Sequence, residues 1–213
     1  MYVILTTFSH KKLCMNEARE ILREYLTVVK SLKKPPERRS NKLFRGHTFA
    51  SILCKHLSKY VPNYDVVLGP IWVKGLEWIE WDCAIVKRAP VMYNLYDPDK
   101  VLALFECKVR GIYGRRDKLP TILENMRDRF RKAEKLGIRC FYVSLMEAKA
   151  KKESGINYYK ETKRWLEGRA FILFNSHSIK TQDNRDVEEL VRDSEEFERE
   201  WETLIREVLR LLQ

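Results

Sequence analysis

Apolar residues follow two different rhythms in the first sixty positions of the chain. The run YVILTTF at 2–8 is apolar and rich in β-formers, which predicts a short strand. Apolar residues then recur every three or four positions through 16–34 and again through 44–61, the spacing of amphipathic helices. Between them, KKPPERRSNK at 33–42 predicts a solvated basic hinge, because consecutive prolines do not fit inside a helix.

The rest of the chain alternates short apolar runs with helical periodicity. Strands are predicted at 64–75, 76–88, 100–109, 138–146 and 169–176. Helices are predicted at 119–137 and 157–168, and a long C-terminal helix at 186–212. This order is typical of an α/β fold in which helices flank both faces of a central mixed β-sheet.

The length of 213 residues suits one domain with its own core. We expect a single domain over 1–213, made of an N-terminal strand and helix (1–34), an α/β core (43–176) and a C-terminal helix (184–213).

Charge is distributed unevenly along the chain. Lys and Arg number 41 against 30 Asp and Glu, a net charge of +11. Residues 183–213 hold 11 acidic and 5 basic residues, a net of −6, so residues 1–182 carry about +17. Such a basic body attracts polyanions, of which nucleic acid is the commonest. The scarcity of Gln beside dense charge indicates a hot-adapted source, and a basic scaffold of thermophilic type is the alternative explanation.

The cysteines and the apolar runs indicate the compartment. The five cysteines are scattered and form no Cys-x-x-Cys pair, which favours buried thiols in a reducing cytosol over a zinc site. No run has the length of a membrane span, and the N-terminus lacks the pattern of a signal peptide. We expect a soluble cytoplasmic protein, located in the host cytoplasm if the source is viral, with no membrane partner.

Two charges interrupt the apolar strand at 100–109. Glu106 and Lys108 are two positions apart and therefore share one face, whereas Cys107 faces the other way, toward the core. The neighbouring residues are apolar on both faces, which indicates a covered sheet where unpaired charges are costly. These charges therefore favour a functional site over the alternative, a cross-strand salt bridge on a solvated face.

A second acidic position lies on the preceding strand. If the two strands form an antiparallel hairpin turning near 94–97, Asp82 lies opposite Lys108 or close to it, beside Glu106. Glu80 shares the face of Asp82 by the same two-residue period. Asp99 is closer in sequence, but about 23 Å of extended strand separates it from Glu106, so Asp99 is expected to be a turn residue.

With Asp82 followed 24 residues later by Glu106-Cys107-Lys108, the chain resembles the PD-(D/E)XK nuclease superfamily. That superfamily has a restriction-endonuclease-like core, with an acidic residue on the second core strand and Glu-x-Lys on the third. The resemblance covers about residues 43–146, including a preceding helix and a following helix and strand.

The resemblance implies a metal-dependent endonuclease. Asp82 and Glu106 would bind Mg²⁺ or Mn²⁺, with the backbone carbonyl of Cys107 as a third ligand and Glu80 as a further candidate. Lys108 would position or help deprotonate the attacking water and stabilise charge in the transition state, and lysine suits this role because its pKa can fall.

The chain departs from one branch of this superfamily. Holliday-junction resolvases carry a Gly followed four residues later by Glu on the first core helix, whereas here Gly46 is followed by Ala50. Glu80 or His47 could replace that Glu, or the site could use one metal. His47 is otherwise expected to cap the helix or contact phosphate.

Basic residues near the predicted site are the candidates for binding nucleic acid. Cations beside a scissile bond bind backbone phosphates. The candidates are Arg45, His47, Arg110, Arg115, Arg116 and Lys118. In the C-terminal helix, apolar residues alternate in steps of four and three from Leu190 to Leu211, which fits either a homodimer seam or packing onto the same chain.

The sequence therefore predicts an Mg²⁺-dependent nuclease that hydrolyses phosphodiester bonds in double-stranded or branched DNA, with structure-selective or junction-resolving action as the narrower form. The alternative is a catalytically inactive nucleic-acid-binding protein of the same fold.

Overall fold

A six-stranded sheet in the order β3-β1-β2-β4-β5-β6 organises the computed structural model, which describes residues 5–31, 38–76, 79–87, 94–112, 118–147, 157–175, 185–197 and 199–213. The strands are β1 (Asp65–Val73), β2 (Trp81–Val86), β3 (Leu95–Tyr96), β4 (Val101–Arg110), β5 (Arg139–Met146) and β6 (Ala170–Phe174). β2 is antiparallel to both β1 and β4, while the β1–β3, β4–β5 and β5–β6 pairs are parallel. The predicted mixed sheet is confirmed.

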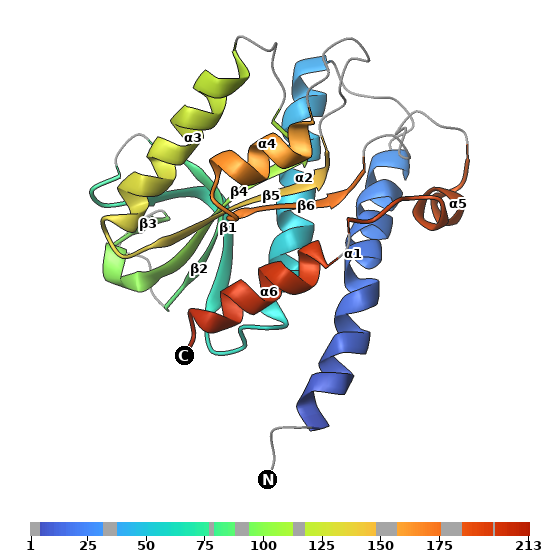
Figure 1. Ribbon diagram of the computed structural model, residues 1–213, viewed down its shortest axis with the longest axis horizontal. Coiled ribbons are helices and arrows are strands. Elements are labelled where there is room, and N and C mark those ends of the chain that lie inside the picture. The colour runs from blue at the N-terminus through green and yellow to red at the C-terminus, as the bar shows by residue number, and fades with distance from the viewer. Residues whose placement is uncertain are drawn as a thin grey trace.

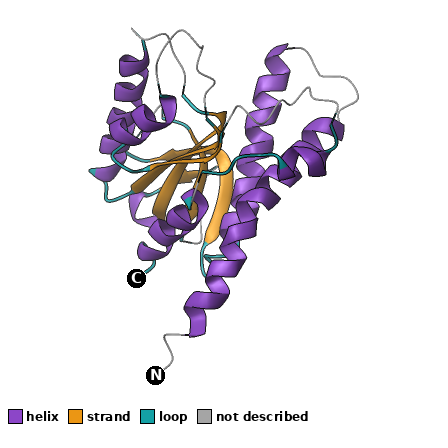
Figure 2. Ribbon diagram, turned by 45° about the vertical axis from the view of Figure 1, so that its right-hand side comes forward, coloured by secondary structure: helices purple, strands orange, loops and turns teal. Residues whose placement is uncertain are grey.

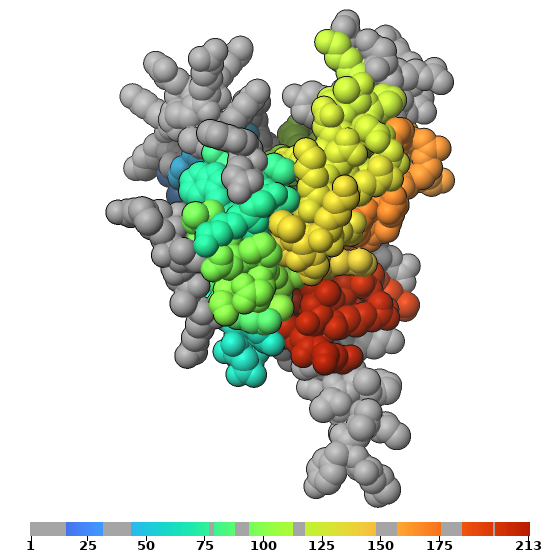
Figure 3. Space-filling model, turned by 90° about the vertical axis from the view of Figure 1, so that its left-hand side faces the viewer, coloured from blue at the N-terminus to red at the C-terminus, as the bar shows by residue number. Residues whose placement is uncertain are grey.

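Helices cover both faces of this sheet (Figures 1 and 2). One face packs against α2 (Arg38–Ser58) and α6 (Glu200–Arg210), with α1 (Leu5–Ser31) and α5 (Val187–Arg192) beside them. The other face packs against α3 (Leu119–Glu134) and α4 (Tyr158–Trp165). Figure 3 shows α3, α4 and α6 at the surface on one side of the molecule, in yellow-green, orange and red. Among the described helices, none is long and apolar enough to cross a membrane.

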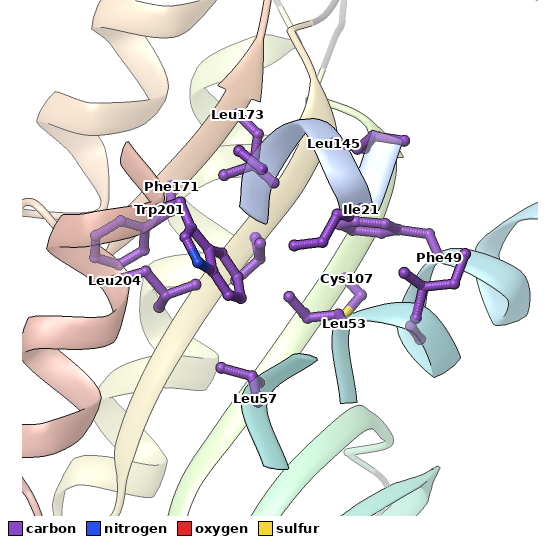
Figure 4. Close-up of a cluster of buried hydrophobic side chains, with 14 of the residues drawn as sticks. Ile21, Phe49, Leu53, Leu57, Cys107, Leu145, Phe171, Leu173, Trp201 and Leu204 are labelled. Atoms are coloured by element: carbon purple, nitrogen blue, oxygen red, sulfur yellow. The ribbon is translucent and has the colours of Figure 1, made fainter. Parts of the chain in front are cut away.

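The period of two along β4 divides the apolar side chains between two cores. Phe105 and Cys107 join the core under α1, α2 and α6, in which Trp201 and Phe171 are also buried (Figure 4). Leu104 belongs to the second core, under α3. Cys107 is 3% exposed and faces the core, as predicted. Glu106 and Lys108 follow Leu104 at intervals of two residues, so these charged residues lie on the same face of β4 as Leu104.

The helix α3 begins where it was predicted and ends at Glu134, three residues before the predicted end at Gly137. It begins at Leu119 with proline in its first turn, and Gly137 just beyond its end adopts a positive φ of 77°. The division of the chain into segments at residues 43 and 176 stays a prediction.

The expected N-terminal strand is wrong over residues 5–8, which are helical, and residues 2–4 lie outside the described part of the chain. The β-forming residues of this short run have no partner strand in the described sheet, and isolated strands are not stable. The run instead continues α1, in which Ile21, Leu22, Tyr25, Leu26 and Val29 are buried as predicted.

The single long C-terminal helix is also wrong. α5 ends at Arg192 and α6 begins at Glu200, after Arg199 in the left-handed region at φ 61°. The intervening residues pair with the edge strand β6, because the N–H of Asn175 donates to the carbonyl of Glu195 at 2.8 Å and that of Phe197 donates to the carbonyl of Leu173 at 2.9 Å. This pairing satisfies backbone groups of an edge strand, which a continuous helix would leave exposed.

The break in the tail also removes the continuous heptad seam. Leu190, Trp201, Leu204 and Val208 are buried in the chain's own core. Packing onto the same chain therefore explains these apolar positions, and a homodimer stays a prediction.

β2 and β4 pair antiparallel as expected, but the connection between them contributes a further short strand. Leu95 and Tyr96 form β3, which pairs in parallel with β1 on the far side of β2. Cys83 pairs with Phe105, and continuing this register places Asp82 opposite Glu106. Asp82 is therefore beside Glu106 as predicted, two residues from the position opposite Lys108.

A buried polar cluster joins α1 to α2. Glu17 is 6% exposed and its carboxylate accepts hydrogen bonds from Lys59, Tyr60 and the Nδ1 of His56, the last at 2.6 Å. Burial alone would raise the pKa of Glu17, but these hydrogen bonds outweigh it and hold the pKa below its ordinary value.

We predict that Glu17→Gln lowers the free energy of unfolding at pH 7 by about 2 kcal/mol, the size expected for hydrogen bonds to a charged group. Because the folded pKa is depressed, this contribution is present above the unfolded pKa of about 4.3 and is lost as the pH falls through the folded value. Urea unfolding from pH 3 to 8 measures the difference. Glu20→Gln, in an exposed ion pair with Arg23, should cost less than about 0.5 kcal/mol at any pH. Equal losses in the two variants would contradict this account of Glu17.

Candidate metal and nucleic-acid site

A pocket of about 610 Å³ opens where α2 passes the ends of β2 and β4. Its lining comes from four segments: Arg45, Gly46, His47 and Ala50 of α2, Gly69 and Pro70 of β1, Glu80 to Asp82 at the start of β2, and Cys107 to Arg110 at the end of β4. Of the residues predicted for catalysis, Asp82 and Lys108 line the pocket, whereas Glu106 directly precedes its β4 segment.

Asp82 and Glu106 lie on neighbouring strands beside this pocket. The Asp82 side chain is 40% exposed, and its Oδ2 accepts a hydrogen bond from the backbone N–H of Cys107 at 2.8 Å. The Glu106 side chain is only 8% exposed. The structure therefore brings together two carboxylates from positions 24 residues apart in the sequence.

Lys108 connects the two carboxylates. Its Nζ lies 3.5 Å from Oδ2 of Asp82 and forms an ion pair with Oε1 of Glu106. Burial alone would lower the pKa of Lys108, but the charges of Glu106 and Asp82 and the hydrogen bond to Glu106 raise it above its ordinary value. Lys108 is therefore an ammonium donor in this arrangement, and a fall of its pKa beside a bound metal ion stays a prediction.

Arg129 of α3 is the residue that the sequence pattern did not single out. Its guanidinium lies 3.1 Å from Oε2 of Glu106, donates to the carbonyl of Glu80 at 2.7 Å and stacks over the ring of Trp81 at 4.9 Å. It is one of three arginines in this helix, and the sequence does not distinguish it from Arg127 and Arg131.

The bulge of β1 brings its backbone against the start of β2. The register of the two strands shifts between Leu68 and Ile71. A Cβ atom at Gly69 would lie 2.1 Å from the carbonyl oxygen of Trp81 and 3.0 Å from that of Asp82. Only glycine permits this approach, which holds the backbone of Asp82 in place.

The predicted nucleic-acid-binding residues divide into three groups. Arg45, His47 and Arg110 line the pocket. Lys118 is exposed before α3 and does not line the pocket. Arg115 and Arg116 lie outside the described residues.

Two further acidic residues are placed by the structure. Glu80 is exposed and lines the pocket. Asp99 lies in the short 3₁₀ turn Pro98–Lys100, where it forms an ion pair with Lys100 at 3.2 Å. Its expected role as a turn residue is confirmed.

The carboxylate oxygens of the site provide part of the ligand set that one hard divalent cation requires. Asp82 and Glu106 supply carboxylate oxygens, and Mg²⁺ in proteins commonly takes one or two carboxylates and keeps its remaining waters. Within the described part of the chain, no cluster of three or more His, Cys, Asp or Glu side chains is arranged to hold a metal ion. Any ion here would therefore rely on two carboxylates, backbone oxygen and water.

Comparison with known proteins gives distant structural similarity only. No protein-family model and no curated protein matches the chain. The structure of NucC from P. aeruginosa ATCC27853 in its cAAA-bound form aligns over 77% of this chain and 74% of that one, with a TM-score of 0.49 and 13% identity. The cAAA-bound NucC of E. coli MS115-1 aligns over 77% and 73%, with a TM-score of 0.48 and 11% identity. Likenesses of this size assign no family, ligand or reaction to this chain.

We predict that Gly69→Ala lowers the free energy of unfolding by about 1–3 kcal/mol, because the strands must separate to admit the methyl group. Gly46→Ala is the matched variant, since a Cβ at Gly46 in α2 meets no atom within 4 Å. It should stabilise the protein by up to about 1 kcal/mol, the difference in helix propensity. Urea unfolding measures both variants, and a tolerated Gly69→Ala would contradict the close approach.

Proposed function

We propose that this protein is a metal-dependent nuclease that hydrolyses phosphodiester bonds in DNA. The observation that carries the proposal is the meeting of Asp82, Glu106 and Lys108 beside a pocket that is also lined by basic side chains. Carboxylates, an ammonium group and guanidinium groups are together the set of groups that phosphoryl-transfer chemistry requires.

Each residue of the site has a role in this proposal. Asp82 and Glu106 would hold Mg²⁺ or Mn²⁺, with the Cys107 carbonyl as a third ligand and exposed Glu80 as a further one. Such an ion polarises a phosphate oxygen and makes a bound water more acidic. The ammonium group of Lys108, half-exposed and directed between the carboxylates, would donate to a phosphate oxygen and stabilise the charge that develops on it.

Two arginines at the pocket are proposed to hold the DNA backbone. Arg110 is exposed at the end of β4, two residues beyond Lys108. The Nε of Arg45 is buried and has no hydrogen-bond partner among the described residues. A buried donor without a partner is costly, and a phosphate oxygen would satisfy it.

Double-stranded or branched DNA is the proposed substrate. The basic residues lie at one mouth beside the carboxylates, so a phosphate backbone crossing the mouth would meet both groups. No described element forms a separate base-reading unit, which favours recognition of DNA shape, including a junction-resolving action, over recognition of sequence.

The second candidate function is binding of nucleic acid without cleavage. Both oxygens of Glu106 are occupied by cations, one by Lys108 and one by Arg129. Ala50, which is buried at the pocket, stands where junction resolvases of the resembled superfamily have a glutamate. These two features favour a site that holds phosphates and does not hydrolyse them.

We predict that the protein cleaves supercoiled or branched DNA in Mg²⁺ or Mn²⁺ and that EDTA abolishes the cleavage. Asp82→Asn and Lys108→Met should each lower the rate at least about 100-fold, because each removes a group that contacts the metal or the transition state. Gel assays of plasmid and junction substrates measure the rates.

Asp99→Asn and Lys132→Met are the matched controls, since both residues are exposed and lie outside the pocket. They should cleave at the wild-type rate. Cleavage that does not depend on a divalent ion would refute the proposed metal-dependent nuclease. Salt-sensitive DNA binding with no cleavage of any substrate would also refute it, and would support the second candidate function, binding without cleavage.

We further predict that Arg45→Ala and Arg110→Ala weaken DNA binding to a similar extent for every sequence. Each should lower the slope of log affinity against log salt by about 1, because one phosphate contact is lost. Fluorescence anisotropy at several salt concentrations gives the slopes. Lys132→Ala on α3 is the control and should leave the slope unchanged. An unchanged slope in Arg45→Ala would show that Arg45 does not contact a DNA phosphate.

A further inference from the structure

Each oxygen of the Glu106 carboxylate already pairs with one cation. Lys108 pairs with its Oε1 and Arg129 lies 3.1 Å from its Oε2. Arg129 is itself held in place, because it donates to the Glu80 carbonyl and stacks over the Trp81 ring. A metal ion that approaches Glu106 can therefore replace the flexible ammonium group at Oε1 far more easily than the anchored guanidinium group at Oε2.

The opposite wall of the pocket carries no carboxylate that could hold a second ion. Its residues from α2 are Arg45, Gly46, His47 and Ala50. Glu80 lines the pocket, but in the described part of the chain no third acidic, His or Cys side chain joins Asp82 and Glu106 in a group that could bind metal.

The charges at the site lead to the same conclusion. Asp82 and Glu106 are balanced by Lys108 and Arg129, so the cluster is neutral as it stands. One divalent ion adds two positive charges, which an arriving phosphate can offset. Two-metal sites place their ions about 3.5–4 Å apart between carboxylates. The one further anionic side chain among the described lining residues, Glu80, carries one negative charge against the two positive charges of a second ion.

We propose that this site takes a single divalent cation and that Arg129 occupies, on Oε2 of Glu106, the position that a second ion would need. This inference rests on the proposed nuclease function. Arg129 is a positioning residue, because it acts through Glu106 and not on the substrate.

Binding of Mn²⁺ to the metal-free protein tests the number of ions without depending on catalysis. Calorimetry and electron paramagnetic resonance should both give one Mn²⁺ per chain for the wild-type protein and none in this site for Asp82→Asn. Two ions per chain would overturn the inference and leave the nuclease proposal standing. No bound Mn²⁺ together with no cleavage would overturn both.

Arg129→Met and Arg127→Met test the role of the guanidinium group. Arg127 lies on the same helix, stacks over Trp165 at 5.0 Å and pairs with Glu124, so its loss removes similar contacts away from the site. Removing the positive charge beside Glu106 should tighten Mn²⁺ binding about threefold or more in Arg129→Met and leave it unchanged in Arg127→Met. Equal affinities in the two variants would overturn the role of Arg129. The wild-type stoichiometry decides the number of ions even if Arg129→Met does not fold.

Discussion

The ion pairs of one buried carboxylate, that of Glu106, set the arrangement of the residues around it. A carboxylate that is 8% exposed is costly unless cations and hydrogen bonds compensate it. Lys108 lies two residues further along the same strand, and the two-residue period of the strand places it on the same face as Glu106. Arg129 lies on α3, the helix that covers this face, and the packing of α3 on the sheet brings its guanidinium group to Glu106. The charged site and the sheet–helix packing are therefore a single structural unit.

The same unit explains why the strands must meet in one register. Asp82 lies next to Glu106 because β2 and β4 pair at Cys83 and Phe105, and its carboxylate then accepts the N–H of Cys107. A slip by one residue would turn Asp82 toward the opposite face of the sheet. The glycine of the β1 bulge contacts the backbone at the same point, so three strands together fix the position of Asp82.

The sequence allowed prediction of what depends on local period and composition. Alternation along β4 correctly separated Glu106 and Lys108 from Cys107, and apolar spacing placed the central strands and α3. The register of β2 on β4 was not predictable, because it depends on a connection that detours to form β3 on β1. Arg129 was not predictable either, because among several helix arginines only tertiary packing selects the one that meets Glu106. The tail broke because pairing with the edge of β6 outweighed its helical periodicity.

The charges of the site are arranged in two layers, and this arrangement separates two tasks. At the base, carboxylates and cations compensate one another, so this layer has little net attraction for a distant polyanion. At the mouth, Arg45 and Arg110 lack such compensation in the contacts described, and they belong to the part of the chain that carries the excess positive charge. Under the proposed function, attraction of a phosphate backbone would therefore depend on the mouth, and binding of the metal ion would depend on the base.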